Sequence, residues 1–176
     1  MNYQPNVYAS ALAYNKSYTF YCLIPKHSSE AYWEEIEIGA MKAVEARRDF
    51  YIDLEIMYYS RLDPHSFIET YQKCLRQNPD GVILVPTTLE VTRQFTDELH
   101  DRNIPFILLD SYMPSLQPLS FYGQDSIQSG RFAARMLMLI AQKEESIMLM
   151  KQTKDGKMAS RQQENREVGF RHYMEE

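Results

Sequence analysis

The sequence predicts an α/β protein in which a doubly wound parallel sheet lies between two layers of helices, a three-layer α/β/α arrangement. Short apolar runs of strand length alternate with longer segments of helical period along most of the chain. Several of these runs are continuously apolar, which is typical of parallel strands covered on both faces. Because right-handed crossovers connect such strands, we expect helices on both sides of the sheet.

The first strand is expected at 18–24, where the sequence YTFYCLI is rich in aromatic residues and ends at Pro25. A helix follows from about Ser29, because apolar residues recur there every three to four positions. Ser28 or Ser29 can cap the start of this helix. The run 51–59 begins in strict alternation and predicts the second strand.

The second helix is expected to open at Asp63-Pro64, where a capping residue precedes proline. Asn-Pro-Asp-Gly at 78–81 is a turn sequence, and it leads into the apolar strand 82–85. Helical spacing then predicts a third helix over about 89–101.

The remaining elements are predicted in the order strand, strand, helix, strand, helix. They are expected at 104–109, 119–122, 126–142, 147–150 and 161–174. In open parallel sheets the ligand site lies outside the carboxyl ends of the strands. We therefore expect the loops 25–29, 86–88 and 110–112 to converge on a binding site.

Composition limits the possible functions. The 176 residues include 19 basic and 24 acidic side chains, a net charge of −5 that argues against a general DNA- or membrane-binding surface. Neither a signal peptide nor a membrane-spanning run is recognisable, so we expect a soluble, cytoplasmic protein. Cys22 and Cys74 are too few for a disulfide scaffold and are expected to be buried, reduced thiols.

No enzyme fingerprint is present in the sequence. The six glycines are too scattered for a dinucleotide-binding loop, and the four histidines lack metal-ligand spacing. There is also no Gly-x-Ser-x-Gly nucleophile elbow. Nothing in the sequence therefore nominates a catalytic set, and neither a cofactor nor a metal is expected. A flavodoxin-like enzyme is the competing class, which bound phosphate, bound flavin or turnover would reveal.

Several short patterns follow one another along nearly the whole chain. They are NYQPNVYASAL at 2–12, Tyr32-Trp33 followed by Gly39, the Asp-Gly-apolar strand 80–84, the Ile-Pro-apolar-Asp strand 104–110, the spacing of Asp125, Gly130, Ala133 and Leu137, and Arg-x-x-Gly-Phe at 166–170. In this order they resemble the lac-repressor family of sugar-responsive bacterial transcription regulators. Each pattern alone is weak, and the resemblance depends on their order.

This resemblance implies a domain organisation. Residues 1–17 would be a hinge segment, 18–124 the N-terminal lobe of the effector-binding core, and 125–176 the beginning of an incomplete C-terminal lobe. The lobe would have the type I periplasmic-binding-protein-like fold. The family's DNA-binding headpiece and most of its second lobe are expected to lie outside this sequence.

The resemblance also implies a sugar site. The candidate ligand-binding residues are Ser28, Tyr32, Trp33, Asp110, Asp125 and Arg166. Aromatic faces pack against sugar rings, and carboxylates accept hydrogen bonds from hydroxyl groups.

Structural roles remain open for several of these residues. Tyr32 and Trp33 point about 100° apart on a helix, so one of them is expected to enter the core. Asp110 is also suited to a turn, Asp125 to a helix N-cap, and Arg166 to a helix surface.

The opening segment implies DNA contacts in the full-length protein, from Tyr3, Asn6, Ala9 and Leu12. Leu12 resembles a wedge that enters the minor groove. The segment alone is shorter than the ~12 residues that a stable isolated helix needs.

The predicted function is therefore that of the sugar-binding core of a regulator. By the resemblance, sugar binding in a homodimer would change the affinity for operator DNA. The alternative is a stand-alone sugar-binding sensor or transport-type protein of the same fold.

Overall fold

The computed structural model describes residues 17–28, 31–61, 63–141, 146–151, 153–154, 157–158 and 161–176. The chain forms two compact units, Met1–Tyr122 and Gly123–Glu176. The candidate DNA-contacting residues Tyr3, Asn6, Ala9 and Leu12 lie outside the described residues.

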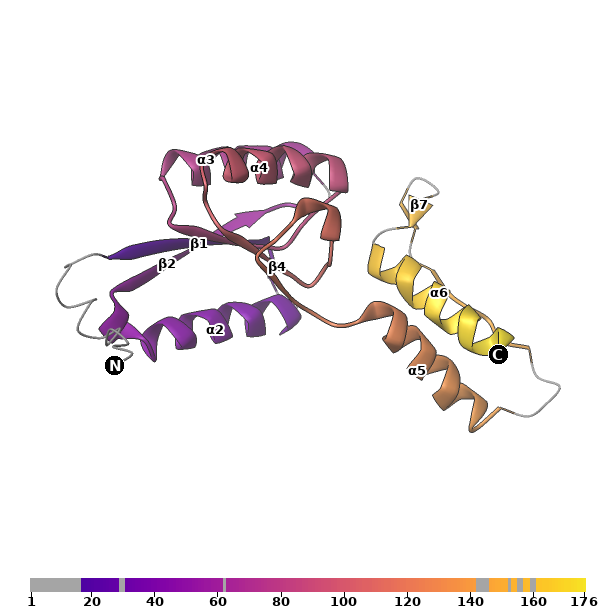
Figure 1. The fold of residues 1–176 in the computed structure, drawn as a ribbon. Helices are drawn as coiled ribbons and strands as arrows, with labels where there is room; N and C mark the ends of the chain where they lie inside the picture. The colour runs from indigo at the N-terminus through magenta and orange to yellow at the C-terminus, as the bar shows by residue number, and fades with distance from the viewer. Residues whose placement is uncertain are drawn as a thin grey trace, which may run out of the picture. The chain divides into compact units, whose positions relative to one another are not determined.

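The first unit contains a five-stranded sheet flanked by helices (Figure 1). Its elements are β1 (Tyr18–Pro25), α2 (Ala31–Glu45), η1 (Arg48–Phe50), β2 (Ile52–Tyr59), α3 (Pro64–Arg76), β3 (Gly81–Leu84), α4 (Leu89–Asp101), β4 (Phe106–Leu109), η2 (Pro114–Leu116) and β5 (Ser120–Tyr122). The strand order is β2-β1-β3-β4-β5, and every neighbouring pair is parallel. The predicted doubly wound parallel sheet is confirmed.

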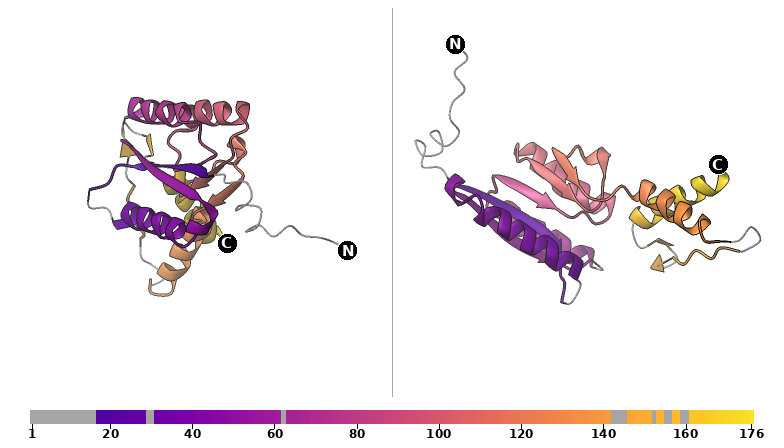
Figure 2. Two further views of the ribbon diagram at one scale, coloured as in Figure 1. Left: turned by 90° about the vertical axis from the view of Figure 1, so that its left-hand side faces the viewer. Right: turned by 90° about the horizontal axis from the view of Figure 1, so that it is seen from below.

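Helices cover both faces of this sheet, with α3 and α4 on one side and α2 on the other (Figures 1 and 2). Alternate side chains of β1 enter the two resulting cores. Tyr21 and Leu23 belong to the larger core beneath α3 and α4, and Cys22 and Ile24 belong to the smaller core beneath α2. Because successive side chains of a strand point to opposite faces, a strand buried on both sides must be apolar throughout.

An aromatic cluster fills the larger core. Phe67 of α3 makes edge contacts with Tyr59 and Phe95, at ring-centroid distances of 4.9 and 6.3 Å. Tyr71 stacks on Phe95 at 4.9 Å. The buried residues of α3 that pack in this core are Phe67, Tyr71, Cys74 and Leu75. Cys22 and Cys74 are both buried and free, as expected.

The second unit is built mainly from two helices, α5 (Ser126–Met138) and α6 (Arg161–Glu175). The two-residue strands β6 (Thr153–Lys154) and β7 (Lys157–Met158) pair antiparallel. A Cβ atom added to Gly130 would overlap the carbonyl oxygen of Arg166, and one added to Gly169 would overlap that of Ile127. The helix backbones touch at these two glycines, which gives both a packing role.

Two expectations are wrong in this unit. Residues 147–150 were expected to form a strand, but no strand is present there. A strand requires a hydrogen-bonded neighbour, and the described part of this unit contains only the β6–β7 ribbon. The helix expected to reach residue 142 ends at Met138. The other expected elements are present with ends within two residues of the expectation.

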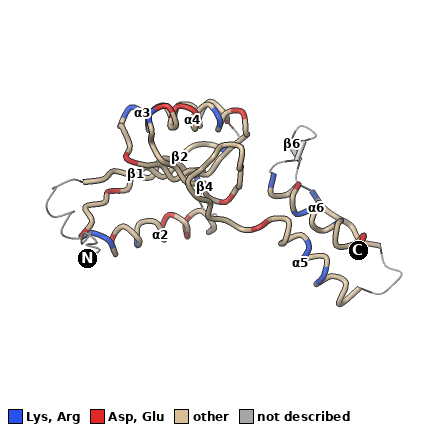
Figure 3. Tube along the Cα trace, viewed as in Figure 1, with Lys and Arg blue, Asp and Glu red and all other residues tan. Residues whose placement is uncertain are grey.

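Helices α2, α3, α4 and α6 carry charges of both signs, whereas α5 carries only the basic Arg131 and Arg135. Figure 3 shows acidic and basic residues along the same helices of the first unit, in α2 and in α4. None of the described helices combines the length and apolar character needed to cross a bilayer.

Candidate functional site

The loops after β1 and β4 meet at the carboxyl edge of the sheet. Tyr32, near the start of α2, donates a hydrogen bond from its hydroxyl to Oδ1 of Asp110, at 2.8 Å. These two residues are 78 positions apart in the sequence. The structure therefore brings together two of the candidate ligand-binding residues at the edge where they were expected.

Asp110 has an unusual backbone. Its φ angle is 65°, in the left-handed region that side chains other than glycine enter at an energetic cost, although aspartate and asparagine enter it more often than most. Its N–H donates to the carbonyl of Tyr122 at 2.9 Å, and the Ser111 hydroxyl donates to Oδ2 at 3.4 Å. This turn holds the half-buried carboxylate where it accepts from Tyr32.

The neighbouring side chains of Tyr32 and Trp33 point in different directions, as adjacent positions on a helix do. The Trp33 side chain packs in the smaller core with only 2% of the residue exposed, whereas Tyr32 is 54% exposed. Their rings meet edge to face at a centroid distance of 4.9 Å. Trp33 thus supports Tyr32 from beneath. Ser28 lies exposed in the loop that follows β1.

Arg61 is a residue of this edge that sequence reasoning missed. It follows β2 by two positions, and its guanidinium carbon lies 5.7 Å from the Trp33 ring centroid. Its place directly after a predicted strand was the signal available in the sequence. No motif distinguished it from an ordinary surface arginine.

Buried Tyr59 lies beneath the same edge. Its hydroxyl donates to the Val85 carbonyl at 2.7 Å. Burial raises the pKa of Tyr59, Arg61 acts to lower this pKa, and Asp110 acts to raise it. Tyr59 therefore stays a neutral donor.

The second unit holds the other two candidates. Asp125 caps α5, because its Oδ1 accepts from the Gln128 N–H at 3.0 Å. The N-cap role considered for this residue is confirmed. Arg166 is exposed on α6 and donates to Oε1 of Gln124 at 3.1 Å. Gln124, which precedes α5, was not among the predicted residues.

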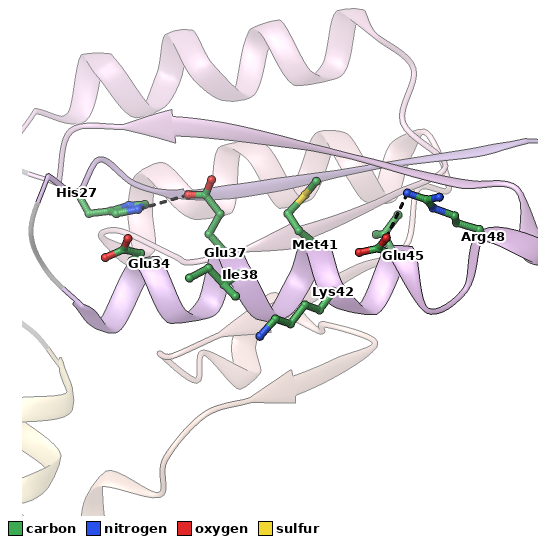
Figure 4. Close-up of a pocket in the computed structure, with 9 residues that line it drawn as sticks. His27, Glu34, Glu37, Ile38, Met41, Lys42, Glu45 and Arg48 are labelled. Carbon is green, nitrogen blue, oxygen red and sulfur yellow. Dashed lines mark ion pairs between the residues drawn. The ribbon is translucent and has the colours of Figure 1, made fainter.

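A hollow of about 520 Å³ on the flank of α2 provides a contrast (Figure 4). Four of its polar side chains pair with one another, His27 with Glu37 and Arg48 with Glu45, both at 3.3 Å. The Tyr58 hydroxyl also donates to Glu37 at 2.8 Å, and burial, followed by Glu37, raises the pKa of Tyr58 to about 12. Because the hollow lies on the flank of α2 and Tyr32 and Asp110 meet at the carboxyl edge of the sheet, we place the candidate site at Tyr32 and Asp110.

The sequence from residue 20 to residue 176 matches the model of the periplasmic binding protein domain. The chain belongs to this family. The periplasmic binding protein domain also accounts for the parallel sheet with helices on both faces. No curated protein sequence matches the chain.

Solved structures resemble this domain closely. A candidate LacI transcriptional regulator from Bacteroides fragilis is 44% identical with a TM-score of 0.83, and the match covers 91% of this chain and 56% of that one. A glucose-galactose binding protein from Geobacillus stearothermophilus is 22% identical with a TM-score of 0.76, covering 92% and 55%.

A solute binding protein from Agrobacterium vitis, bound with alpha-D-tagatopyranose, is 21% identical with a TM-score of 0.71, covering 90% of this chain and 54% of that one. The chain therefore spans slightly more than half the length of these three proteins. These three proteins are two binding proteins and a candidate regulator.

Proposed function

We propose that the chain is the sugar-binding core portion of a lac-repressor-type transcription regulator, in which sugar binding controls the affinity for operator DNA. The observation that carries the sugar site is the hydrogen bond between Tyr32 and Asp110. It combines a half-exposed aromatic ring and a carboxylate, the two groups that sugar sites use, at the carboxyl edge of a parallel sheet.

In this proposal Asp110 accepts hydrogen bonds from sugar hydroxyls, and the Tyr32 ring packs against the apolar face of the sugar. The Ser28 hydroxyl adds a polar contact, and Trp33 holds Tyr32 in place. In the second unit, Arg166 and Asp125 are proposed as ligand residues, with Asp125 retaining its capping bond to α5.

The domain assignments follow the same proposal. Residues 1–17 are the hinge segment, 18–124 the N-terminal lobe, and 125–176 the start of the C-terminal lobe. Operator DNA and a second copy of the chain are the proposed partners of the full-length protein, in the cytoplasm.

Two observations support a regulator. The opening segment resembles the family's hinge, and the 44% identical structure is a candidate LacI regulator. A stand-alone sugar-binding protein is the second candidate, supported by the folds of the transport-type and glucose-galactose binding proteins. Operator binding by the full-length protein that changes when sugar is added would favour the regulator, and unchanged or absent DNA binding would favour the second candidate.

The sugar site is tested by Asp110→Asn with a panel of monosaccharides. Asparagine also adopts left-handed backbone conformations, so this change removes the charge with little effect on the turn. A sugar present at 100 times its dissociation constant stabilises the native protein by about 2.7 kcal/mol. We expect the resulting thermal shift to be largely lost in Asp110→Asn.

The control is Asp97→Asn, since Asp97 is an exposed carboxylate on α4. It should retain the full sugar-induced shift. Equal shifts in wild type and Asp110→Asn would place the site elsewhere.

A further inference from the structure

Four side chains form a continuous row at the carboxyl edge of the first unit, here called the edge row. Asp110 accepts from Tyr32, Tyr32 meets Trp33 edge to face, and Arg61 lies against the Trp33 ring. Tyr32 and Trp33 lie at the start of α2, Arg61 lies in the loop after β2, and Asp110 directly follows β4. The row thus has a carboxylate at one end and a guanidinium at the other.

Arg61 contacts an aromatic ring, whereas two other arginines of the same unit pair with carboxylates. Arg48 and Arg102 each form an ion pair with a glutamate of the same or the preceding helix, Glu45 and Glu98, at 3.3 Å. Within the described part of the chain, Arg61 has no carboxylate partner, and its contact is with an indole ring. A guanidinium stacked on an aromatic face keeps its in-plane N–H donors available.

Asp110 and Arg61 act on a common neighbourhood. The pKa of Tyr59 is raised mainly by burial of its side chain. Arg61 acts to lower this pKa, and Asp110 acts to raise it. An anionic ligand on Asp110 alone would meet like-charge repulsion. A cation at the other end of the edge row offsets that repulsion and offers a planar fork that matches a carboxylate or phosphate.

We propose that Arg61 binds an anionic group of the ligand, so that the site selects monosaccharides that carry one carboxylate or phosphate. The sugar hydroxyls bind Asp110, and the anionic group binds Arg61. This inference rests on the proposed sugar site and names its ligand class.

The test compares acidic sugars with their neutral parents. D-galacturonate, D-glucuronate and D-galactose 6-phosphate are titrated beside D-galactose and D-glucose, by calorimetry and by the emission of Trp33, the single tryptophan. We expect at least one acidic sugar to bind about tenfold more tightly than its parent, equivalent to about 1.4 kcal/mol. The carboxylate and phosphate arms show which anion fits.

Variants assign this preference to Arg61. Arg61→Gln should reduce the ratio of acidic to neutral affinity to about one, chiefly by weakening the binding of the acidic sugar. Arg76→Gln should keep the ratio, because Arg76 ends α3, away from the edge row, and is exposed.

The outcomes separate two failures. Three results would overturn the role of Arg61 and leave the proposed sugar site intact. Neutral sugars could bind as tightly as the acidic sugars, or Arg61→Gln could leave the ratio of acidic to neutral affinity unchanged. Inorganic phosphate alone could also bind as tightly as the acidic sugar. No binding of any sugar would overturn the proposed function, and this inference with it.

Discussion

The two units of the chain use similar apolar patterns with different results. In the first unit every predicted strand pairs with a parallel neighbour, and helices cover both faces of the sheet. In the second unit the apolar run 147–150 is outside any strand, and Phe132, Leu139 and Ile140 are exposed. An apolar run therefore becomes a buried strand only where the same chain supplies its neighbours.

The largest expected effect comes from one substitution made in both units. Phe67 is 0% exposed in the aromatic cluster of the first unit, whereas Phe132 on α5 is 63% exposed. Phe67→Ala should lower the free energy of unfolding by about 3–5 kcal/mol, because it removes a buried ring and leaves a cavity. Denaturant unfolding followed by Trp33 fluorescence measures this loss.

Phe132→Ala is the matched control. An exposed side chain that leaves no cavity should change the free energy of unfolding by no more than about 0.5 kcal/mol. If both variants lost similar stability, the contrast between a packed first unit and an incompletely covered second unit would be wrong.

A smaller effect is expected at the contact between α5 and α6. Gly130→Ala places a methyl group against the backbone of Arg166, which a flexible side chain cannot relieve. Such overpacking costs about 1–3 kcal/mol, so amide hydrogen exchange in α5 and α6 should accelerate. Unchanged protection in both helices would mean that they do not pack at this glycine.

Gly39→Ala on α2 is expected to have the smallest effect on the free energy of unfolding, and to raise it rather than lower it. A Cβ atom at this position meets no atom within 4 Å. Alanine is about 1 kcal/mol more favourable than glycine inside a helix, so this variant should be stabilised. A destabilised Gly39→Ala would show that the outer face of α2 is covered by something in solution.

The sequence predicted the first unit well because its signals are local. Continuous apolar runs indicated strands buried on both faces, and Asp63 before Pro64 correctly indicated the start of α3. The run 147–150 carried the same local signal and failed, because strand pairing depends on residues far away in the sequence.

The site was predictable in part for the same reason. Asp110 was proposed because it ends an apolar strand that resembles the family's Ile-Pro-apolar-Asp strand, and the hydrogen bond to Tyr32 is consistent with that placement. The left-handed backbone of Asp110 and the contact of Arg61 with Trp33 were not predictable, because both arise from tertiary packing between loops. Gln124 was missed because its partner Arg166 lies 42 residues away.

The most direct measurement of the central claim is a map of amide chemical shifts during titration of the chain with the tightest-binding sugar of the panel. We predict the largest shifts at Tyr32, Asp110 and Ser111, with little change at Ile38 and Met41 in the hollow on the flank of α2. Shifts concentrated in that hollow, with Tyr32 and Asp110 unaffected, would contradict the account.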